Sequence, residues 1–181
     1  MKTRYFIAIS IALLMAVVYL IFQNKTAYYI VRHAEKSGDM LTGEGQNRAA
    51  TLRDSLIGKN IKNVWVSTTN RSQQTAAPLV EALAAAGSFD EAEQYHIYDY
   101  PDSDGGASFM TSLKANKGNM LIVGHTDNIN AIIDSLIHKD EVISINSEDY
   151  DNMYVVRIRR SILSILNTKE LVYTTYGEES P

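Results

Sequence analysis

Three clusters of polar side chains each follow a short apolar run of the kind that forms a buried strand. They are residues 32–35 (Arg-His-Ala-Glu), 67–71 (Ser-Thr-Thr-Asn-Arg) and 124–128 (Gly-His-Thr-Asp-Asn). In an open parallel sheet, the segments that follow the carboxyl ends of the strands share one edge, and ligands bind there. We therefore expect two histidines and two arginines to meet in one pocket. These four residues are Arg32, His33, Arg71 and His125.

Two arginines that face one pocket indicate an anion between them, because the forked donors of guanidinium fit phosphate oxygens. A neutral imidazole is a good nucleophile and could accept a phosphoryl group. A zinc site on the two histidines is an alternative, but it needs a third ligand and the arginines would repel the cation. Each residue taken alone fits an ordinary structural role, as we expect for His96 and His138. The predicted convergence favours a phosphoryl site.

Short apolar runs alternate with helical patterns through the body of the chain. The predicted strands are residues 27–31, 63–66, 94–98 and 120–123. The predicted helices are one that Thr42 caps and Gly58 ends, and residues 73–86, 107–115 and 128–137. Pro78 lies inside the second helical pattern and predicts a kink or a later start. Strands that alternate with helices predict a three-layer α/β/α domain whose mainly parallel sheet is covered on both faces.

The last part of the chain has a different pattern and is predicted to be all strand. The predicted strands are residues 153–158, 161–166 and 171–176, with a hairpin turn at residues 167–170. We expect these strands to add an antiparallel edge to the sheet.

The N-terminal segment is apolar and carries no charge from residue 5 to residue 22. A helix of this length covers about 27 Å, close to the hydrocarbon thickness of a bilayer. Because Lys2 and Arg4 precede it, we expect a signal anchor over residues 1–24 with its N-terminus in the cytoplasm. Residues 25–181 would then form the catalytic domain outside the cytoplasm. A cleaved signal peptide, which would leave the domain secreted or periplasmic, is the alternative.

Composition excludes several classes of function. The 181 residues contain no cysteine, which excludes disulfides, thiolate metal sites and cysteine nucleophiles. The formal net charge is −4, and no clustered basic face predicts binding to nucleic acid. The one short basic run, which we expect to be solvated, is Arg157, Arg159 and Arg160.

Four motifs, in this order along the chain, resemble the histidine phosphatase superfamily, which also contains the cofactor-dependent phosphoglycerate mutases. The first is Arg32-His33-Ala34, which fits the family's Arg-His-Gly or Arg-His-Ala signature. The second is the Leu-Thr-x-x-Gly-x-x-Arg-Ala stretch at Leu41, Thr42, Gly45, Arg48 and Ala49. The third is Arg-x-x-Gln-Thr-Ala at Arg71, Gln74, Thr75 and Ala76, and the fourth is Gly124-His125. The resemblance implies the phosphoglycerate mutase-like fold in its short, branch 1 form.

The resemblance also implies roles for the four residues of the predicted pocket. His33 would be the nucleophile that becomes phosphohistidine, while Arg32, Arg71 and His125 would hold the phosphoryl oxygens. Thr126, directly after the second histidine, joins the predicted substrate-binding residues. No metal and no cofactor is expected, because guanidinium and imidazolium groups can supply the positive field. Glu35 is expected to orient a basic neighbour rather than touch substrate.

The acid that protonates the leaving group stays open among four candidates. Three of them, Asp99, Asp102 and Asp104, lie in the polar segment after the predicted strand at 94–98. The fourth is Asp127, two residues after His125, although the phytase-like branch of the family has its acid directly after that histidine.

The function predicted from the sequence is therefore hydrolysis of a phosphomonoester by a metal-independent histidine phosphatase of the acid phosphatase type. The expected substrate is a phosphorylated small molecule or envelope component, with membrane contact through the N-terminal helix and no nucleic acid. A phosphomutase of the same superfamily and a non-catalytic phosphate-binding module are the alternatives. A mutase is disfavoured because it must shield its phosphoenzyme from water, and this body lacks the longer insertions that do so.

Overall fold

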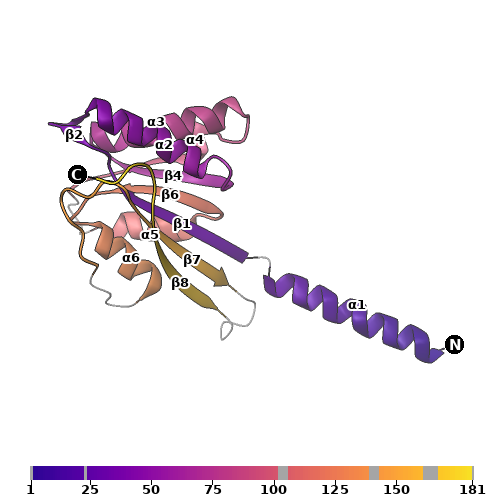
Figure 1. Cartoon of the computed structure of the whole chain (residues 1–181). Helices are drawn as coiled ribbons and strands as arrows, with labels where there is room; N and C mark the ends of the chain where they lie inside the picture. The colour runs from indigo at the N-terminus through magenta and orange to yellow at the C-terminus, as the bar shows by residue number, and fades with distance from the viewer. Residues whose placement is uncertain (1, 23, 102–105, 139–142, 161–166, 181) are drawn as a thin grey trace.

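A computed structural model describes residues 2–22, 24–101, 106–138, 143–160 and 167–180 of the chain. Its centre is a six-stranded sheet with the order β5-β4-β6-β1-β7-β8 (Figure 1). Four strands run parallel: β5 (Tyr95–Tyr98), β4 (Ile61–Ser67), β6 (Asn119–Gly124) and β1 (Asn24–Arg32). Two antiparallel strands, β7 (Asn152–Arg160) and β8 (Thr168–Thr175), extend the sheet beyond β1.

Helices cover both faces of this sheet (Figure 1). On one face lie α2 (Gly43–Leu56) and α3 (Asn70–Ala85), and on the other lie α5 (Ala107–Ala115) and α6 (Ile129–Ile137). A short helix, α4 (Glu91–Gln94), leads into β5. The three-layer α/β/α architecture with a mainly parallel sheet and an antiparallel edge is therefore confirmed.

Two hydrophobic cores lie on the two faces of the sheet, because neighbouring residues of a strand point to opposite sides. Ile30 of β1 and Ile122 of β6 belong to the core under α5 and α6. Their neighbours Val31 and Val123 belong to the core under α2 and α3. All four are fully buried, which is why these strands read as continuous apolar runs in the sequence.

Local details correct several expectations. Thr42 caps α2 as predicted, since its side chain accepts a hydrogen bond from the Gly45 N–H at 3.1 Å. Helix α3 begins at Asn70 and runs through Pro78, so the predicted later start is wrong. The hairpin turn predicted at 167–170 is also wrong, because β8 already begins at Thr168, which pairs with Arg159 of β7. The strand predicted at 161–166 lies outside the described residues.

A two-stranded hairpin of β2 (Lys36–Ser37) and β3 (Met40–Leu41) precedes α2 and was not predicted. Strands of two residues are too short to show a period in the sequence. The turn between its two strands carries Asp39, which forms an ion pair with Arg71.

The N-terminal segment forms a helix, α1 (Lys2–Phe22), that projects from the body (Figure 1). A membrane span requires one helix that is both long enough and apolar enough to match the bilayer. Within the described ranges no helix meets both requirements. The predicted transmembrane helix and signal anchor are therefore wrong, and so is the predicted single-pass location with the domain outside the cytoplasm.

Candidate active site

The three predicted clusters meet at one edge of the sheet. Arg32 at the end of β1 lies in register with Gly124 at the end of β6, and Val66 near the end of β4 lies in register with Val123. The backbone N–H of His33 donates to the carbonyl of Gly124 at 3.1 Å, which joins the first and third clusters directly. The sequence therefore located this edge correctly from strand ends alone.

His33 is held in a single orientation that leaves one ring nitrogen available. Its Nδ1 lies 2.9 Å from the carbonyl oxygen of Ala34. A carbonyl only accepts, so Nδ1 carries the hydrogen and Nε2 carries the lone pair. The backbone N–H of Ala34 in turn donates to the Thr75 hydroxyl at 2.9 Å, which fixes this segment to α3. His33 is 3% exposed, and no further hydrogen bond engages its ring among the described residues.

The surroundings of His33 keep its imidazole neutral. The pKa of His33 is lowered from 6.5 to about 4, mainly by burial and also by the positive charges of Arg32, Arg71 and Lys36, while the hydrogen bond to Ala34 opposes the shift. Burial also lowers the pKa of His125 to about 3, with His33 and Arg71 adding to the effect. At neutral pH both rings are therefore uncharged, which is the form a nucleophilic histidine needs.

His125 lies beside His33, with ring centroids 5.2 Å apart. Its Nε2 shares a 2.8 Å hydrogen bond with the hydroxyl of Ser67, the last residue of β4. The ring of Tyr100 stacks on it at 3.7 Å with an interplanar angle of 12°. Its backbone N–H donates to Asn128 Oδ1 at 2.8 Å. Contacts from three different segments of the chain thus hold the ring and the backbone of His125 in place.

The glycine before His125 is required by close packing. A Cβ added at Gly124 would lie 2.9 Å from Asn128 Oδ1 and 3.0 Å from a side-chain carbon of Ile129. A larger residue would push away the asparagine that holds the backbone of His125. The Gly-His pair of the fourth motif therefore has a steric reason.

Arg32 is pinned along one edge of its guanidinium. Its Nη1 donates to the carbonyl of Ser147, and its Nη2 donates to the hydroxyl of Tyr150 at 3.3 Å. The guanidinium carbon lies 4.1 Å from the centre of the Tyr150 ring, in a cation–π contact. The Nε is buried and has no hydrogen-bond partner in the described part of the chain. The Nε donor, which together with Nη2 can bind an oxyanion side-on, is therefore left without a partner from the described residues.

Arg71 repeats this arrangement at the start of α3. Its Nη1 lies 2.8 Å from Asp39 Oδ1, at the turn of the β2–β3 hairpin. Asp39 also accepts hydrogen bonds from the backbone and the side chain of Asn70, and these bonds together with Arg71 lower the pKa of Asp39. As in Arg32, the Nε is buried and unpartnered among the described residues. Two guanidinium groups near His33 thus each keep a buried Nε donor without a partner among the described residues.

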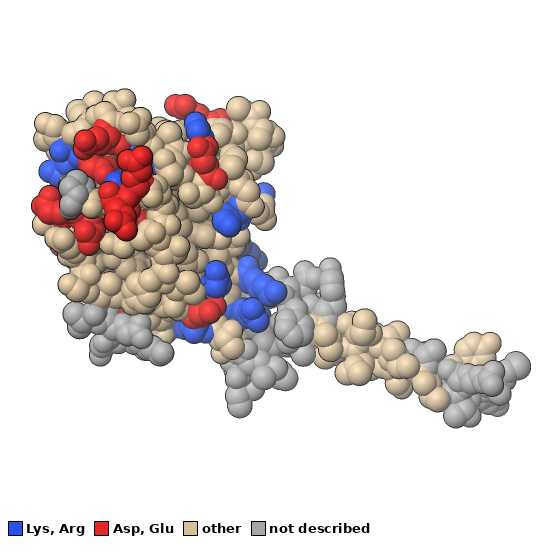
Figure 2. All heavy atoms as spheres, viewed as in Figure 1, with Lys and Arg blue, Asp and Glu red and all other residues tan. Residues whose placement is uncertain are grey.

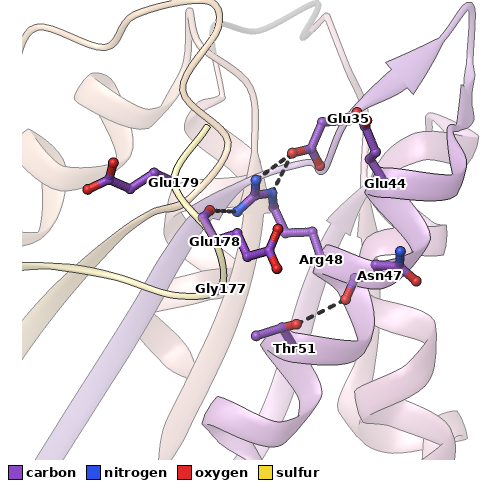
Figure 3. A pocket seen from close by; sticks show the side chains of 8 residues that line it. All are labelled: Glu35, Glu44, Asn47, Arg48, Thr51, Gly177, Glu178 and Glu179. Carbon is purple, nitrogen blue, oxygen red and sulfur yellow. Dashed lines mark hydrogen bonds and ion pairs between the residues drawn. The ribbon is translucent and has the colours of Figure 1, made fainter. Parts of the chain in front are cut away.

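Glu35 orients a basic neighbour, as expected, and this neighbour is Arg48 of α2. Arg48 Nε and Nη2 both lie 2.6 Å from Oε1 of Glu35 (Figure 3). Its Nη1 donates to the backbone carbonyls of Tyr176 at 3.3 Å and Glu178 at 3.0 Å. Every nitrogen of this guanidinium therefore has a partner within the protein.

Arg48 lines a cavity of about 300 Å³ between α2 and the C-terminal segment, residues 176–180 (Figure 3). Its walls carry four carboxylates: Glu35, Glu44, Glu178 and Glu179. Figure 2 shows Asp and Glu side chains gathered on the face around the C-terminus. A phosphate dianion would be repelled here, so this cavity does not serve as the phosphoryl site.

The remaining motif residues hold the His33 segment, residues 32–35, against the helices. A Cβ at Gly45 would lie 2.1 Å from the backbone oxygen of Glu35, so only glycine fits there. Ala49 packs with Ala34 and Leu41 in a small buried cluster. Gln74 Oε1 accepts from the backbone N–H of Leu41 at 2.9 Å, which ties the β2–β3 hairpin to α3.

The structure separates the candidates for the general acid. Asp127 Oδ2 accepts a 2.7 Å hydrogen bond from the hydroxyl of Tyr100, the same residue that stacks on His125. Burial and this bond to Asp127 raise the pKa of Tyr100 to about 12. Asp99 is exposed just after β5, and Thr126 is half-buried next to His125. Asp102 and Asp104 lie outside the described residues.

Sequence reasoning missed the side chains that hold the predicted ones. Asp39 could have been found, because Gly38-Asp39 is a typical turn between short strands. Tyr100 and Tyr150 lie in irregular segments, and Tyr150 is 118 residues away from the arginine that it contacts. No local pattern in the sequence signals such a contact.

Comparison with known proteins agrees with this geometry. The sequence pattern of the histidine phosphatase superfamily (branch 1) matches residues 28–92, which include Arg32, His33 and Arg71 but not His125. No curated protein sequence matches this chain.

Several solved structures share the fold. A protein assigned as the phosphohistidine phosphatase SixA from Agrobacterium tumefaciens is 15% identical, with a TM-score of 0.52 and coverage of 82% of this chain and 96% of that protein. A protein assigned as an alpha-ribazole-5'-P phosphatase from Escherichia coli is 16% identical, with a TM-score of 0.54 and coverage of 82% and 97%. Phosphoglycerate mutase from Plasmodium falciparum is 14% identical, with a TM-score of 0.51 and coverage of 88% and 94%.

At these identities the likeness is one of fold, and the fold is common to phosphatases and a mutase. The matched segment and the shared fold together confirm the resemblance to the histidine phosphatase superfamily (branch 1) that the four motifs indicated.

Proposed function

We propose that this protein is a phosphatase that hydrolyses a phosphomonoester through a phosphohistidine on His33. The observation that carries the proposal is the state of the His33 ring. Its Nδ1–H is bound to the Ala34 carbonyl, and burial lowers its pKa to about 4. Nε2 therefore offers a lone pair at neutral pH, and the two arginines whose charges act on this ring, Arg32 and Arg71, have Nε atoms without a partner among the described residues.

The first step is attack of His33 Nε2 on phosphorus while the bond from phosphorus to the leaving oxygen breaks. Positive charge then develops on the imidazole, and the Nδ1–H···O=C bond to Ala34 stabilises it. The unpaired donors of Arg32 and Arg71 would bind the equatorial phosphoryl oxygens. Stabilising the negative charge on these oxygens is the main task of an enzyme in phosphoryl transfer. His125, fixed by Ser67 and Tyr100, would contact the same oxygens.

The leaving oxygen needs a proton, and among the described candidates Asp127 has the best position for this role. Both Asp127 and Asp99 are exposed, but Asp127 accepts a hydrogen bond from Tyr100, whose ring stacks on His125, and no such contact links Asp99 to His125 among the described residues. In the second step a water attacks phosphorus, the bond to Nε2 breaks, and inorganic phosphate leaves with the neutral imidazole restored. The same acid, now deprotonated, would take the proton from this water.

In this proposal the site residues contact the phosphoryl group of the substrate. Related folds include proteins assigned as phosphatases of a small phosphorylated molecule and of phosphohistidine. We therefore propose a phosphorylated small molecule as the substrate.

The test uses the full chain with a radiolabelled phosphomonoester, rapid quenching and detection of acid-labile phosphate on the protein. We expect a labelled intermediate that disappears in His33→Ala together with turnover. The matched control is His138→Asn at the exposed end of α6, where the backbone is left-handed (φ 56°) and asparagine is tolerated. This control should keep full activity.

Full turnover in His33→Ala would contradict the proposal. Transfer of the label to a second hydroxyl rather than to water would identify a mutase. Phosphate binding without any labelled protein or turnover would instead identify a non-catalytic phosphate-binding module.

A further inference from the structure

Arg32 is held by residues that no motif contains. Both contacts to its guanidinium nitrogens come from the 147–151 loop, which precedes β7. Arg32 is only 7% exposed, and the Tyr150 ring lies against its face. The same ring lies 6.1 Å from that of His33, centroid to centroid. Tyr150 is thus the aromatic side chain that contacts the arginine next to the nucleophile.

These contacts determine which donors of the guanidinium are free. Guanidinium has five N–H donors in one plane. Ser147 takes one on Nη1, and Tyr150 takes one on Nη2, while Nε keeps its donor. The guanidinium carbon also lies 4.1 Å from the centre of the Tyr150 ring, which adds a cation–π contact to these two hydrogen bonds. Among the described residues these contacts leave three donors for an oxyanion, the one on Nε and one on each of Nη1 and Nη2.

The C-terminal segment fixes the loop that carries Tyr150. The Tyr150 N–H donates to the Ser180 hydroxyl at 2.8 Å, and this hydroxyl donates to Asp151 Oδ1 at 3.2 Å. The Tyr176 N–H donates to the Asp151 carbonyl at 2.9 Å. The same segment is bound on its other side by Arg48. It therefore connects the anchored Arg48 to the arginine of the phosphoryl site.

We propose that Tyr150 is a positioning residue that sets the Arg32 guanidinium for a phosphoryl group, and that Ser180 holds Tyr150 in place. The inference rests on the proposed function, since it assumes that Arg32 binds the phosphoryl oxygens. Tyr150 acts through Arg32 and has no chemical role of its own. Its effect on phosphate binding must then depend on the presence of an arginine at position 32.

The test measures the dissociation constant of inorganic phosphate by calorimetry and kcat/KM for p-nitrophenyl phosphate, both on the full chain. Tyr150→Leu keeps apolar bulk but removes the π face and the hydroxyl. We expect it to weaken phosphate binding and to lower kcat/KM by roughly tenfold, as loss of a desolvated cation–π contact allows. Tyr150→Phe keeps the π face and should stay within about threefold of the wild type.

A double-mutant cycle separates positioning from a general structural role. In an Arg32→Lys background, Tyr150→Leu should cause no further loss. In an Arg71→Lys background it should keep its full effect. Ser180→Ala should act in the same direction as Tyr150→Leu but more weakly, and it provides the test if Tyr150→Leu does not fold. The matched control is Tyr173→Leu on the outer strand β8, which should change neither constant.

An equal loss from Tyr150→Leu in the Arg32→Lys background would overturn the inference. So would phosphate binding within twofold of the wild type in a folded Tyr150→Leu protein. If the wild type binds phosphate but never turns over an ester, the proposed function fails while the binding cycle still decides the role of Tyr150. If the ester is hydrolysed and the cycle shows no coupling, only the role of Tyr150 fails.

Discussion

Two groups of arginines near the His33 segment differ in how completely the protein satisfies them. Arg48 donates from Nε and Nη2 to the Glu35 carboxylate and from Nη1 to two backbone carbonyls. Its guanidinium is therefore already occupied by a carboxylate of the protein. Arg32 and Arg71 are held through Nη1 in the same way, but the Nε of each is buried without a partner among the described residues. All three arginines are thus held by protein acceptors at Nη1. They differ at Nε, which is paired in Arg48 and, within the described ranges, unpaired in Arg32 and Arg71.

The difference teaches how to distinguish a structural arginine from a binding arginine when both are in family motifs. Leaving a buried donor unpaired costs free energy, so a folded chain retains one mainly where a ligand can pair it. Arg48 has no such donor, and its contacts join α2, the His33 segment and the C-terminal segment. We therefore expect changes at Arg48 to affect mainly stability, and changes at Arg32 and Arg71 to affect mainly phosphoryl chemistry.

The largest expected effect is on stability, in Arg48→Met. The side chains of Arg48 and Glu35 are 8% and 12% exposed, and removing one partner leaves the other charge buried and unpaired. We expect a loss of about 3 to 5 kcal/mol in the free energy of unfolding, measured with urea. Adding Glu35→Gln to Arg48→Met should recover much of this loss, because no buried charge is then left unpaired.

For the Glu35–Arg48 ion pair we also expect a limited effect on activity. Glu35→Ala should lower kcat/KM without abolishing it, because Glu35 orients Arg48 and does not contact the phosphoryl group. A complete loss of turnover in a folded Glu35→Ala protein would show that the Glu35 carboxylate takes part in the chemistry, and would break the distinction drawn between the two groups of arginines.

The second prediction concerns the two open arginines. Arg32→Lys and Arg71→Lys keep the charge but remove the planar fork. Each should lower kcat/KM by roughly 10²- to 10³-fold, as loss of an oriented donor to a transition-state oxyanion does. The midpoint of urea unfolding should change little in either variant. Near-normal kcat/KM in both would mean that the unpaired donors do not bind the phosphoryl group.

The sequence located this site because the necessary information is local. Each apolar strand is followed at once by its polar residues, and the parallel order of strands brings those residues to one edge. Arg32, His33, Arg71 and His125 were predicted to meet in this way. Tyr150 and Ser180 could not be found, because their contacts to Arg32 and to each other depend on how an irregular loop and the chain end pack together.

The N-terminal segment shows the limit of composition as evidence. An uncharged apolar run predicted a membrane span, and the helix does form, but within the described ranges no helix is both long and apolar enough to cross a bilayer. The hairpin predicted at 167–170 failed for a related reason. Turn-forming residue types were present there, but pairing with β7 placed those residues inside β8.

The third prediction tests how the His33 segment is held against α2. Gly45→Ala would place a Cβ 2.1 Å from the backbone oxygen of Glu35, so the segment or the helix must move. We expect a loss of about 1 to 3 kcal/mol in the free energy of unfolding, with reduced kcat/KM because His33 is two residues from Glu35. The matched control is Gly43→Ala in the same helix, where no atom lies within 4 Å of the added carbon. It should be neutral or slightly stabilising, and equal effects at both positions would refute the steric explanation.

The smallest expected effect is a shift in the pKa of His33. Its size in arginine variants compares the influence of Arg71 with that of Arg48. NMR titration of the ring Cε1–H signals should give midpoints near pH 4 for His33 and near pH 3 for His125, well below the ordinary value of about 6.5. Both rings then stay neutral through physiological pH. Because the unfolded chain binds these protons near pH 6.5, the free energy of unfolding should fall as the pH drops from there toward 4.

Two arginine variants separate the causes of the His33 shift. Arg71→Gln removes one of the cations that act on His33 and should raise its titration midpoint. Arg48→Met should leave that midpoint unchanged, because Arg48 is paired with Glu35 and is not among those cations. A His33 midpoint near 6.5 in the wild type, or one that moves with Arg48 and not with Arg71, would contradict the proposed electrostatics of the site.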